Sequence, residues 1–497
     1  MRNRTLALNV ALLLAVCLGL AAQAQMPPPG QAPPPSKGVV LKGKAPVSDQ
    51  VLQVKLPRPQ QVTLPSGLHL MVLEDRRLPQ INFNLVIRGA GGYVDPADLP
   101  GAATFTAALM REGTTTRSSQ QVSQELETLS ATLMASAGMS SDTASVSGSC
   151  LTEHTDKLFD LLADMLLNPA FSDEELARYK ERTRANLIQQ RSNPGFLASE
   201  MFARVMYGSH PSSRISPTAE ALDKATRAAL VEFHKAHYIP DHAALAISGD
   251  ISLAQARKIV ETKLAGWKKA GTPLPQPTEP PAPSPSKIHL VARPNSVQTN
   301  FVVGVPAIDR LSPEYEILQV MNQVIGGGPT GRLFLHLREE KGYTYGAYSG
   351  MSAPRTRGHW SASTDVRSEV TEPALRDLLA EVARMRDEAV PDKEFRDRKR
   401  SMIASFALGL ESPAQVLNYY TTSWIYKLPA DYWDKYPERI TAVTQAQVQA
   451  AARKYFDASR LQIVAVGDAT KIGTTLKGFG EVEMYDTEGK RITSSTN

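Results

Sequence analysis

The sequence predicts an α+β fold of two homologous halves, each an antiparallel or mixed sheet covered by helices on one face. The chain has 497 residues, too many for one hydrophobic core, which indicates at least two domains. A proline-rich stretch, 271–286, divides it almost midway, and short motifs before this stretch recur after it. With 42% hydrophobic and 21% charged residues, the composition is that of an ordinary globular protein.

The recurring motifs keep their order and a nearly constant separation. Chance could supply one such match, but several in order indicate a duplication. The pairs are Gln80–Phe83 with Gln298–Phe301 (218 residues apart), Ser172–Leu176 with Pro391–Phe395 (219) and Gly249-Asp250 with Gly467-Asp468 (218).

Each half opens with strands and closes with one. In the first half, the alternation of apolar and polar residues predicts strands over 68–73 and 82–86, and an apolar run predicts a closing strand over 243–248. The corresponding closing strand of the second half is predicted over 461–466. Long amphipathic helices lie between these strands, which favours helices packed on one face of a sheet.

The first 24 residues form a predicted signal peptide. A basic start, Met1–Thr5, precedes an apolar stretch that ends in the small-x-small sequence Ala22-Gln23-Ala24. A single membrane anchor is the alternative, but the small residues at the exit and the prolines that follow favour cleavage. We therefore expect a periplasmic or secreted protein. After cleavage Cys150 is the only cysteine, so no disulfide can form within the chain.

These features divide the chain into six segments. They are a signal peptide (1–24), a proline-rich leader (25–50), a first α+β domain (51–270), a proline-rich linker (271–287), a second α+β domain (288–480) and a tail without predicted structure (481–497).

The charge of the chain argues against nucleic acid as a partner. The formal net charge is +5, and without Arg2 and Arg4 of the signal peptide 53 basic residues face 50 acidic ones, which leaves +3. The charges are scattered rather than gathered in one stripe. We expect no nucleic-acid partner and, after signal cleavage, no membrane span.

Four stretches carry a resemblance to a known family. They are 55-KLPRPQQVTLPSGLHLMVLED-75, 207-YGSHPSSRISPTAEAL-222, 233-FHKAHYIPDHAALAISGD-250 and 333-LFLHLREEKGYTYGAY-348. From about residue 55 to about 480, the chain resembles the pitrilysin/insulinase family of zinc peptidases, and within it the processing-peptidase-like subunits. The resemblance implies a pair of homologous α+β halves, in agreement with the duplication.

In active members of that family, one helix carries a His-x-x-Glu-His motif. Its two histidines bind zinc, its glutamate activates a water molecule, and a later glutamate completes the metal site. The stretch 100-PGAATFTAALMREGTTT-116 resembles this helix, with Gly101 before it and Gly113-Thr114 after it. It contains no histidine.

The resemblance places non-ligating residues at every metal and general-base position. The aligned residues are Thr104 and Ala108 for the two histidines, Ala107 for the general base, and Ala185 or Asn186 for the later glutamate. A threonine and alanines cannot bind zinc or move the proton. We therefore expect this chain to bind no metal and to hydrolyse no peptide alone, with zinc held by a partner subunit.

No other histidine cluster replaces the motif. Glu232, His234 and His237 form the closest grouping, but Phe233 between them indicates a helix that packs on a sheet, which favours structural histidines. His210, in a Tyr-Gly-x-His-Pro turn, is also interpreted as structural.

The second half keeps two residues that the family uses at its active site. Arg338 lies near the end of a predicted helix, 331–340, and Tyr345 begins a predicted strand, 343–349. The resemblance implies that such an Arg and Tyr, seven residues apart, reach across a closed chamber and donate hydrogen bonds to the substrate near the scissile carbonyl. Taken alone, they could be a helix-end cation and a half-buried strand residue. The full Leu-Arg-x-x-x-Gly-x-x-Tyr context favours the functional role.

Three glycines, Gly326, Gly327 and Gly328, follow a predicted helix. They could simply end that helix, because glycine accepts positive φ. They also resemble, in shorter form, the glycine-rich loop with which the non-metal subunit of processing peptidases contacts substrate. Arg332 follows this loop and could pair with a partner subunit or with Glu339.

Two functions from different classes remain open at this point. The first is a non-zinc-binding subunit of an exported heterodimeric metallopeptidase, which supplies Arg338 and Tyr345 to the active site of a His-x-x-Glu-His partner. Its substrates would be peptides or unfolded polypeptide segments. The second is an inactive, stand-alone peptide-binding or scaffold protein that keeps the fold for its surface.

Overall fold

The computed structural model describes residues 52–492. The predicted signal peptide (1–24) and leader (25–50) lie outside the described residues, as do the last five residues of the chain. No helix within 52–492 is both long enough and apolar enough to cross a bilayer.

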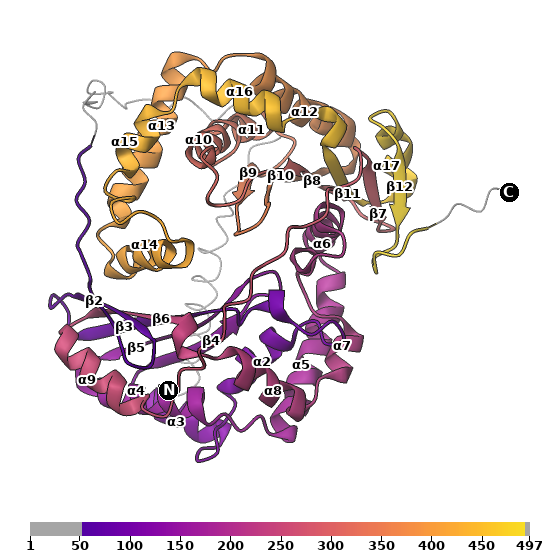
Figure 1. Ribbon diagram of the computed structural model, residues 1–497. Helices are drawn as coiled ribbons and strands as arrows, with labels where there is room; N and C mark the ends of the chain where they lie inside the picture. Colours follow the sequence, from indigo (N-terminus) through magenta and orange to yellow (C-terminus); the bar gives the residue numbers. More distant parts are fainter. Residues whose placement is uncertain (1–51, 493–497) are drawn as a thin grey trace, which may run out of the picture. The chain divides into compact units, whose positions relative to one another are not determined.

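The first half contains a six-stranded mixed sheet (Figure 1). The strand order is β1-β2-β6-β3-β5-β4, in which β2 and β6 are parallel and the other neighbours are antiparallel. The strands are β1 (Gln60–Thr63), β2 (His69–Glu74), β3 (Gln80–Arg88), β4 (Thr132–Ala137), β5 (Thr143–Leu151) and β6 (Ala243–Gly249). The strands predicted over 68–73, 82–86 and 243–248 are therefore confirmed within one residue or as part of a longer strand.

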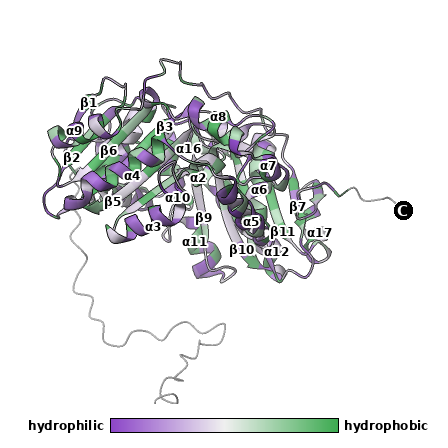
Figure 2. Cartoon of the chain, turned by 90° about the horizontal axis from the view of Figure 1, so that it is seen from below, coloured by the Kyte–Doolittle hydropathy of each residue, from purple (hydrophilic) through white to green (hydrophobic). Residues whose placement is uncertain are grey.

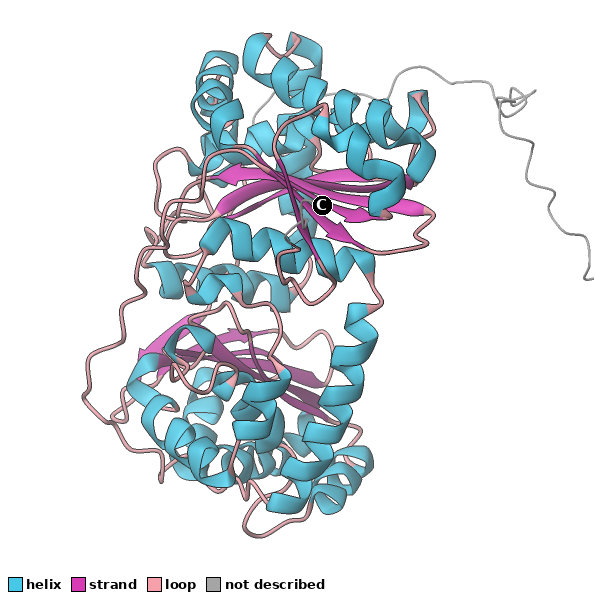
Figure 3. Ribbon diagram, turned by 90° about the vertical axis from the view of Figure 1, so that its right-hand side faces the viewer, coloured by secondary structure: helices cyan, strands magenta, loops and turns pink. Residues whose placement is uncertain are grey.

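The first half contributes eight helices within the described chain. They are α2 (Ala102–Met110), α3 (Ser119–Thr128), α4 (Thr155–Leu167), α5 (Asp173–Arg191), α6 (Pro194–Tyr207), α7 (Ala219–Lys224), α8 (Arg227–His237) and α9 (Leu253–Lys263). Helices α2, α4 and α9 contact β4, β5 and β2, and their apolar sides form a buried core with the strands. Figure 3 shows each sheet with a layer of helices against one face.

The second half repeats this arrangement. Its sheet has the order β12-β7-β11-β8-β10-β9, with β7 parallel to β11. The strands are β7 (Ile288–Ala292), β8 (Gln298–Pro306), β9 (Ala347–Ser352), β10 (His359–Arg367), β11 (Gln462–Gly467) and β12 (Val482–Tyr485). The helices are α10 (Tyr315–Ile325), α11 (Arg332–Phe334), α12 (Thr371–Asp387), α13 (Asp392–Gly409), α14 (Pro413–Tyr426), α15 (Tyr436–Ala442), α16 (Gln445–Tyr455) and α17 (Ala469–Lys477).

Short helical turns of other types connect these elements. They are the 3-10 turns η1 (Gly92–Val94), η2 (Thr152–His154), η3 (Pro211–Ser213), η4 (Pro240–His242), η6 (Ser368–Val370) and η7 (Ala458–Arg460), and the π-helix η5 (Leu335–Glu340).

Equivalent elements of the two halves begin at the offsets that the sequence motifs predict. β3 and β8 begin 218 residues apart, at Gln80 and Gln298, and α5 and α13 begin 219 apart, at Asp173 and Asp392. Both sheets place their closing strand, β6 or β11, between the first two strands of the repeat. The predicted α+β fold of two homologous halves is confirmed.

The halves differ at one edge of the sheet. β1 precedes β2 and pairs antiparallel with it, whereas β12 comes from the end of the chain and pairs parallel with β7. The expectation of an unstructured tail after residue 480 is therefore wrong for Val482–Tyr485. The strand has only four residues, too few for the alternation of apolar and polar side chains to identify it in a sequence.

Each half contributes one helix to the other half's sheet. α6 contacts β8 and β11, and α14 contacts β6, β2 and β3. Phe202 and Met206 of α6 are buried with Val302 and Val464, while Leu417 of α14 is buried on the first sheet. The central strands β3 and β6 are largely hydrophobic over most of their length (Figure 2). The linker over 271–284 has no helix or strand.

Candidate functional site

The helix that resembles the metal-binding helix, α2, is capped by a side chain from outside it. Asp95 accepts hydrogen bonds from the backbone N–H groups of Gly101 (2.6 Å) and Ala103 (2.8 Å). Burial raises the pKa of Asp95 to about 6, although these two hydrogen bonds favour its charged form. Gly101 has a φ of +109°, which glycine adopts without strain, so the chain can turn directly into the helix.

The positions on α2 that the resemblance aligns with the family's zinc ligands and general base hold no zinc-binding side chain. Thr104 donates its hydroxyl hydrogen to the carbonyl of Ala137 at 2.9 Å, so this side chain fixes α2 to β4. Ala107, at the general-base position, is fully buried, and Ala108 is half-buried. These residues offer zinc neither an imidazole nor a carboxylate, so no step of a reaction can pass through a metal ion here.

The position that the resemblance aligns with the later glutamate offers no carboxylate either. Asn186 and Ala185 are both exposed on α5, a helix that contacts α2. Within residues 52–492, no group of three or more His, Cys, Asp or Glu side chains could hold a metal ion. A zinc site of the family's type therefore does not fit the residues of this chain.

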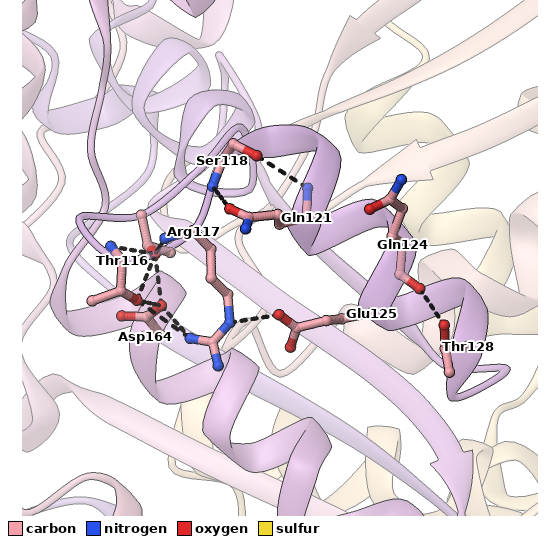
Figure 4. A network of polar contacts seen from close by, with 9 residues as sticks. Thr116, Arg117, Ser118, Gln121, Gln124, Glu125, Thr128 and Asp164 are labelled. Atoms are coloured by element: carbon pink, nitrogen blue, oxygen red, sulfur yellow. Dashed lines mark hydrogen bonds and ion pairs between the residues drawn. The ribbon is translucent and has the colours of Figure 1, made fainter.

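The Gly-Thr sequence after α2 has a structural role (Figure 4). Asp164 of α4 accepts hydrogen bonds from the hydroxyls of Thr114 (2.6 Å) and Thr116 (2.7 Å) and pairs with Arg117 (2.5 Å). Burial alone would raise the pKa of Asp164, but these hydrogen bonds outweigh it and lower the pKa. The network joins the segment after α2 to α4. The Gly-Thr sequence thus stabilises the fold and needs no metal ion to explain it. Arg117 also pairs with Glu125 of α3.

Arg338 lies in a π-helix rather than in the continuous α-helix predicted over 331–340. After the single turn α11, the segment Leu335–Glu340 forms η5, in which the N–H of Lys341 donates to the carbonyl of His336, five residues earlier. The side chain of Arg338 is 44% exposed. Within the described chain its one ion pair joins Nε to Glu339 Oε1 at 3.6 Å, too long for a hydrogen bond.

Tyr345 lies in a bend before β9, so the strand predicted over 343–349 begins too early. The side chain of Thr344 donates to the carbonyl of Gly346 and accepts from its N–H, both at 3.0 Å, and this local turn delays the strand until Ala347. Tyr345 is 82% exposed.

The segment between Arg338 and Tyr345 folds back on η5. The N–H of Gly342 donates to the carbonyl of Arg338 (3.0 Å), and that of Tyr343 donates to the carbonyl of Leu337 (2.9 Å). Gly342 has a φ of +62°, which permits this reversal. A short, hydrogen-bonded loop therefore connects the two candidate side chains.

Two of the three glycines before α11 are required by packing. A Cβ on Gly326 would lie 2.7 Å from the backbone nitrogen of Ser349, and one on Gly327 would lie 2.8 Å from Cα of Gln323. Gly328 has no atom within 4 Å of such a Cβ. Ser349 also donates its N–H to the carbonyl of Gly326 at 2.8 Å. The loop is thus attached to β9, and a contact with substrate stays a prediction for it.

The histidines outside the motif have structural partners. His234 Nε2 donates to the carbonyl of Leu166 at 3.0 Å, and His237 Nδ1 lies 2.8 Å from the carbonyl oxygen of Gly89. Burial lowers the pKa of His234 to about 4, so it is neutral in the folded chain. His210 accepts from the N–H of Ser212 within its own turn at 3.1 Å.

Comparison with known proteins identifies the family. A model of the insulinase family (peptidase family M16) matches residues 70–215, and a model of the peptidase M16 inactive domain matches residues 224–402. The chain belongs to the insulinase family. It lacks the His-x-x-Glu-His motif of that family's active members.

Similar proteins come from several bacteria. A peptidase M16 inactive domain from Pseudomonas fluorescens has 29% sequence identity and a TM-score of 0.77, and the match covers 82% of this chain and 98% of that one. An uncharacterized zinc protease of Streptomyces coelicolor is 23% identical over 79% of this chain and 86% of its own length. A protease from Helicobacter pylori, 16% identical with a TM-score of 0.77, covers 83% of this chain and 100% of its own and has the same fold.

Proposed function

We propose that this chain is the non-zinc-binding subunit of an exported, heterodimeric zinc metallopeptidase. The partner is a homologous subunit with the His-x-x-Glu-His motif, which holds the zinc ion and the general base. This chain contributes Arg338 and Tyr345, which donate hydrogen bonds to the peptide substrate and to the oxyanion that forms at the scissile carbonyl. Export through the predicted signal peptide places the complex in the periplasm or outside the cell.

The exposed Arg338 and Tyr345, in a chain whose metal positions hold no ligand, carry this proposal. The guanidinium offers several donors in a fixed plane, it is always charged, and its contact with Glu339 is too long to occupy those donors. Tyr345 exposes a phenol that adds one short donor. Two such donors suit a developing negative charge, whereas the proton transfer and the metal would have to come from another chain.

Replacing Tyr345 by Phe tests this role, because the change removes one hydroxyl and keeps the ring. The chain is mixed with a His-x-x-Glu-His homologue from the same organism, and kcat for a peptide is measured. Removing one hydrogen-bond donor to the oxyanion raises the activation free energy by about 3 kcal/mol, so we expect kcat to fall about 100-fold. Affinity between the subunits, measured by calorimetry, is expected to stay the same.

Tyr485→Phe is the matched control. Tyr485 lies on β12, at the opposite edge of the same sheet from β9, and its hydroxyl donates to Glu483. This variant is expected to leave kcat unchanged. If Tyr345→Phe also leaves kcat unchanged, the proposal is wrong, and peptide binding by the isolated chain would then support a stand-alone binding protein.

A further inference from the structure

Three side chains, those of Arg338, Phe334 and Tyr348, contact one another in series, and we call them the Arg338 stack. The guanidinium carbon of Arg338 lies 4.8 Å from the ring centroid of Phe334, and the rings of Phe334 and Tyr348 are 5.5 Å apart with an interplanar angle of 40°. The ring of Tyr348 lies directly against Gly346, where a Cβ would be 2.6 Å from it. Glycine at 346 therefore permits this position of Tyr348.

Phe334, the ring that contacts Arg338, is held in place by burial. Phe334 is 5% exposed, and Leu337 in the same turn is fully buried. His336 Nδ1 lies 2.9 Å from Glu381 Oε1, which attaches η5 to α12. Arg338, four residues after Phe334 and on the exposed side of η5, thus rests on a ring that has little freedom to move.

Tyr348, the other ring of the stack, is connected to Tyr345 through the backbone of the same short segment. Tyr348 belongs to β9, where it pairs in register with Ser363 of β10, and Gly346 directly follows Tyr345. The position of Tyr345 is set by its backbone, through the two hydrogen bonds between Thr344 and Gly346. The same short segment therefore holds the backbone of Tyr345 and carries Tyr348, whose ring packs against that of Phe334.

We infer that Phe334 and Tyr348 are positioning residues that hold the guanidinium of Arg338 beside the Tyr345 loop before substrate arrives. The inference rests on the proposed function and adds two residues to it. An unsupported arginine side chain samples many rotamers, and a guanidinium stacked on an aromatic face samples fewer. Because oxyanion donors work best when they are already oriented, loss of the stack slows the reaction without removing a donor.

A double-mutant cycle in the active mixture with the His-x-x-Glu-His subunit tests this inference. The variants are Tyr348→Leu, Arg338→Ala and the combination, and kcat/KM is measured for each. Tyr348→Leu is expected to lower kcat/KM about 5- to 10-fold when Arg338 is present and by less than about 2-fold when Arg338 is absent, since its effect passes through Arg338. Tyr348→Phe keeps the ring and is expected to restore most of the activity, whereas Gly346→Ala displaces the ring and is expected to act like Tyr348→Leu.

The outcomes separate this inference from the proposed function. If Tyr348→Leu lowers kcat/KM equally with and without Arg338, or has no effect in either background, the inference is wrong while the proposed function stands. If Arg338→Ala and Tyr345→Phe are themselves without effect, both are wrong. Tyr348 is 43% exposed, so its variants should fold, and urea unfolding of each variant checks this.

Discussion

Two arginines six residues apart have opposite environments. Arg332 is 5% exposed and forms two parallel hydrogen bonds with Glu394, both 2.9 Å long, so it pairs neither with Glu339 nor with a partner subunit. Arg338 is 44% exposed and lacks such a carboxylate partner among the described residues. A buried, bidentate arginine serves the fold, and an exposed one with available donors can serve a substrate.

This contrast predicts different effects on stability. We expect Arg332→Ala to lower the free energy of unfolding by about 2–3 kcal/mol, because Glu394 would lose its partner in a partly buried site. Arg338→Ala should change it by less than about 0.5 kcal/mol, as is usual for exposed positions. Urea unfolding followed by circular dichroism compares the two. Equal losses would mean that Arg338 is also structural, which contradicts its proposed role.

Two histidines join elements that are distant in the sequence. His234 connects α8 to the end of α4 through the carbonyl of Leu166, and His359 of β10 lies 2.6 Å from the hydroxyl of Tyr207 on α6. Burial lowers the pKa of each histidine to about 4. Both contacts therefore exist with neutral imidazoles, and protonation opposes the packing of these elements.

The chain should consequently lose stability in acid. An unfolded histidine takes up a proton near pH 6.5, whereas the folded ones resist it until about pH 4, so stability is fully present above pH 6.5 and is lost as the pH falls toward 4. At pH 5 we expect a loss of about 1–2 kcal/mol for each histidine relative to pH 7.5. Urea unfolding at both pH values measures it. The double variant His234→Gln, His359→Gln should show a shallower pH dependence, and an unchanged slope would contradict the assignment.

Periodicity predicts the existence of elements better than their local geometry. The segment around Arg338 has helical spacing, but apolar spacing alone does not distinguish an α-turn from the π-helix η5. Tyr345 lies in a stretch rich in β-forming residues. The side chain of Thr344, however, forms hydrogen bonds with the backbone of Gly346, two residues later, and this turn delays the start of the strand. Strand β12 is not predicted because its four residues are too few for their alternation to identify a strand.

At the scale of the whole molecule, the duplication was predictable because its motifs survive at a constant offset. The packing of α6 on the second sheet and of α14 on the first sheet could not be predicted. An apolar helix face indicates that the face is buried, but it does not indicate which surface covers it. That zinc-binding residue types are missing at the positions aligned with the family's motif is read directly from the sequence, because zinc binding requires specific residue types at fixed positions. The stack of Phe334 and Tyr348 depends on a contact across a loop, so no local pattern indicates it.

In the proposed complex, the metal belongs to one chain and the two hydrogen-bond donors, Arg338 and Tyr345, belong to the other. Helix α2 is a regular helix that Asp95 caps and that Thr104 bonds to β4. It therefore folds without the zinc-binding residues of the motif. In the proposed complex, this chain takes part in peptide hydrolysis beside a subunit that holds the metal.

Reconstitution of the two subunits tests this central claim most directly. Increasing amounts of this chain are added to a fixed amount of the His-x-x-Glu-His homologue, and peptide cleavage is followed, with each subunit also measured alone. We predict almost no cleavage by either subunit alone, and activity that rises with added chain and saturates at one chain per partner. Full activity of the homologue alone, or cleavage by this chain alone in the presence of zinc, would contradict the account.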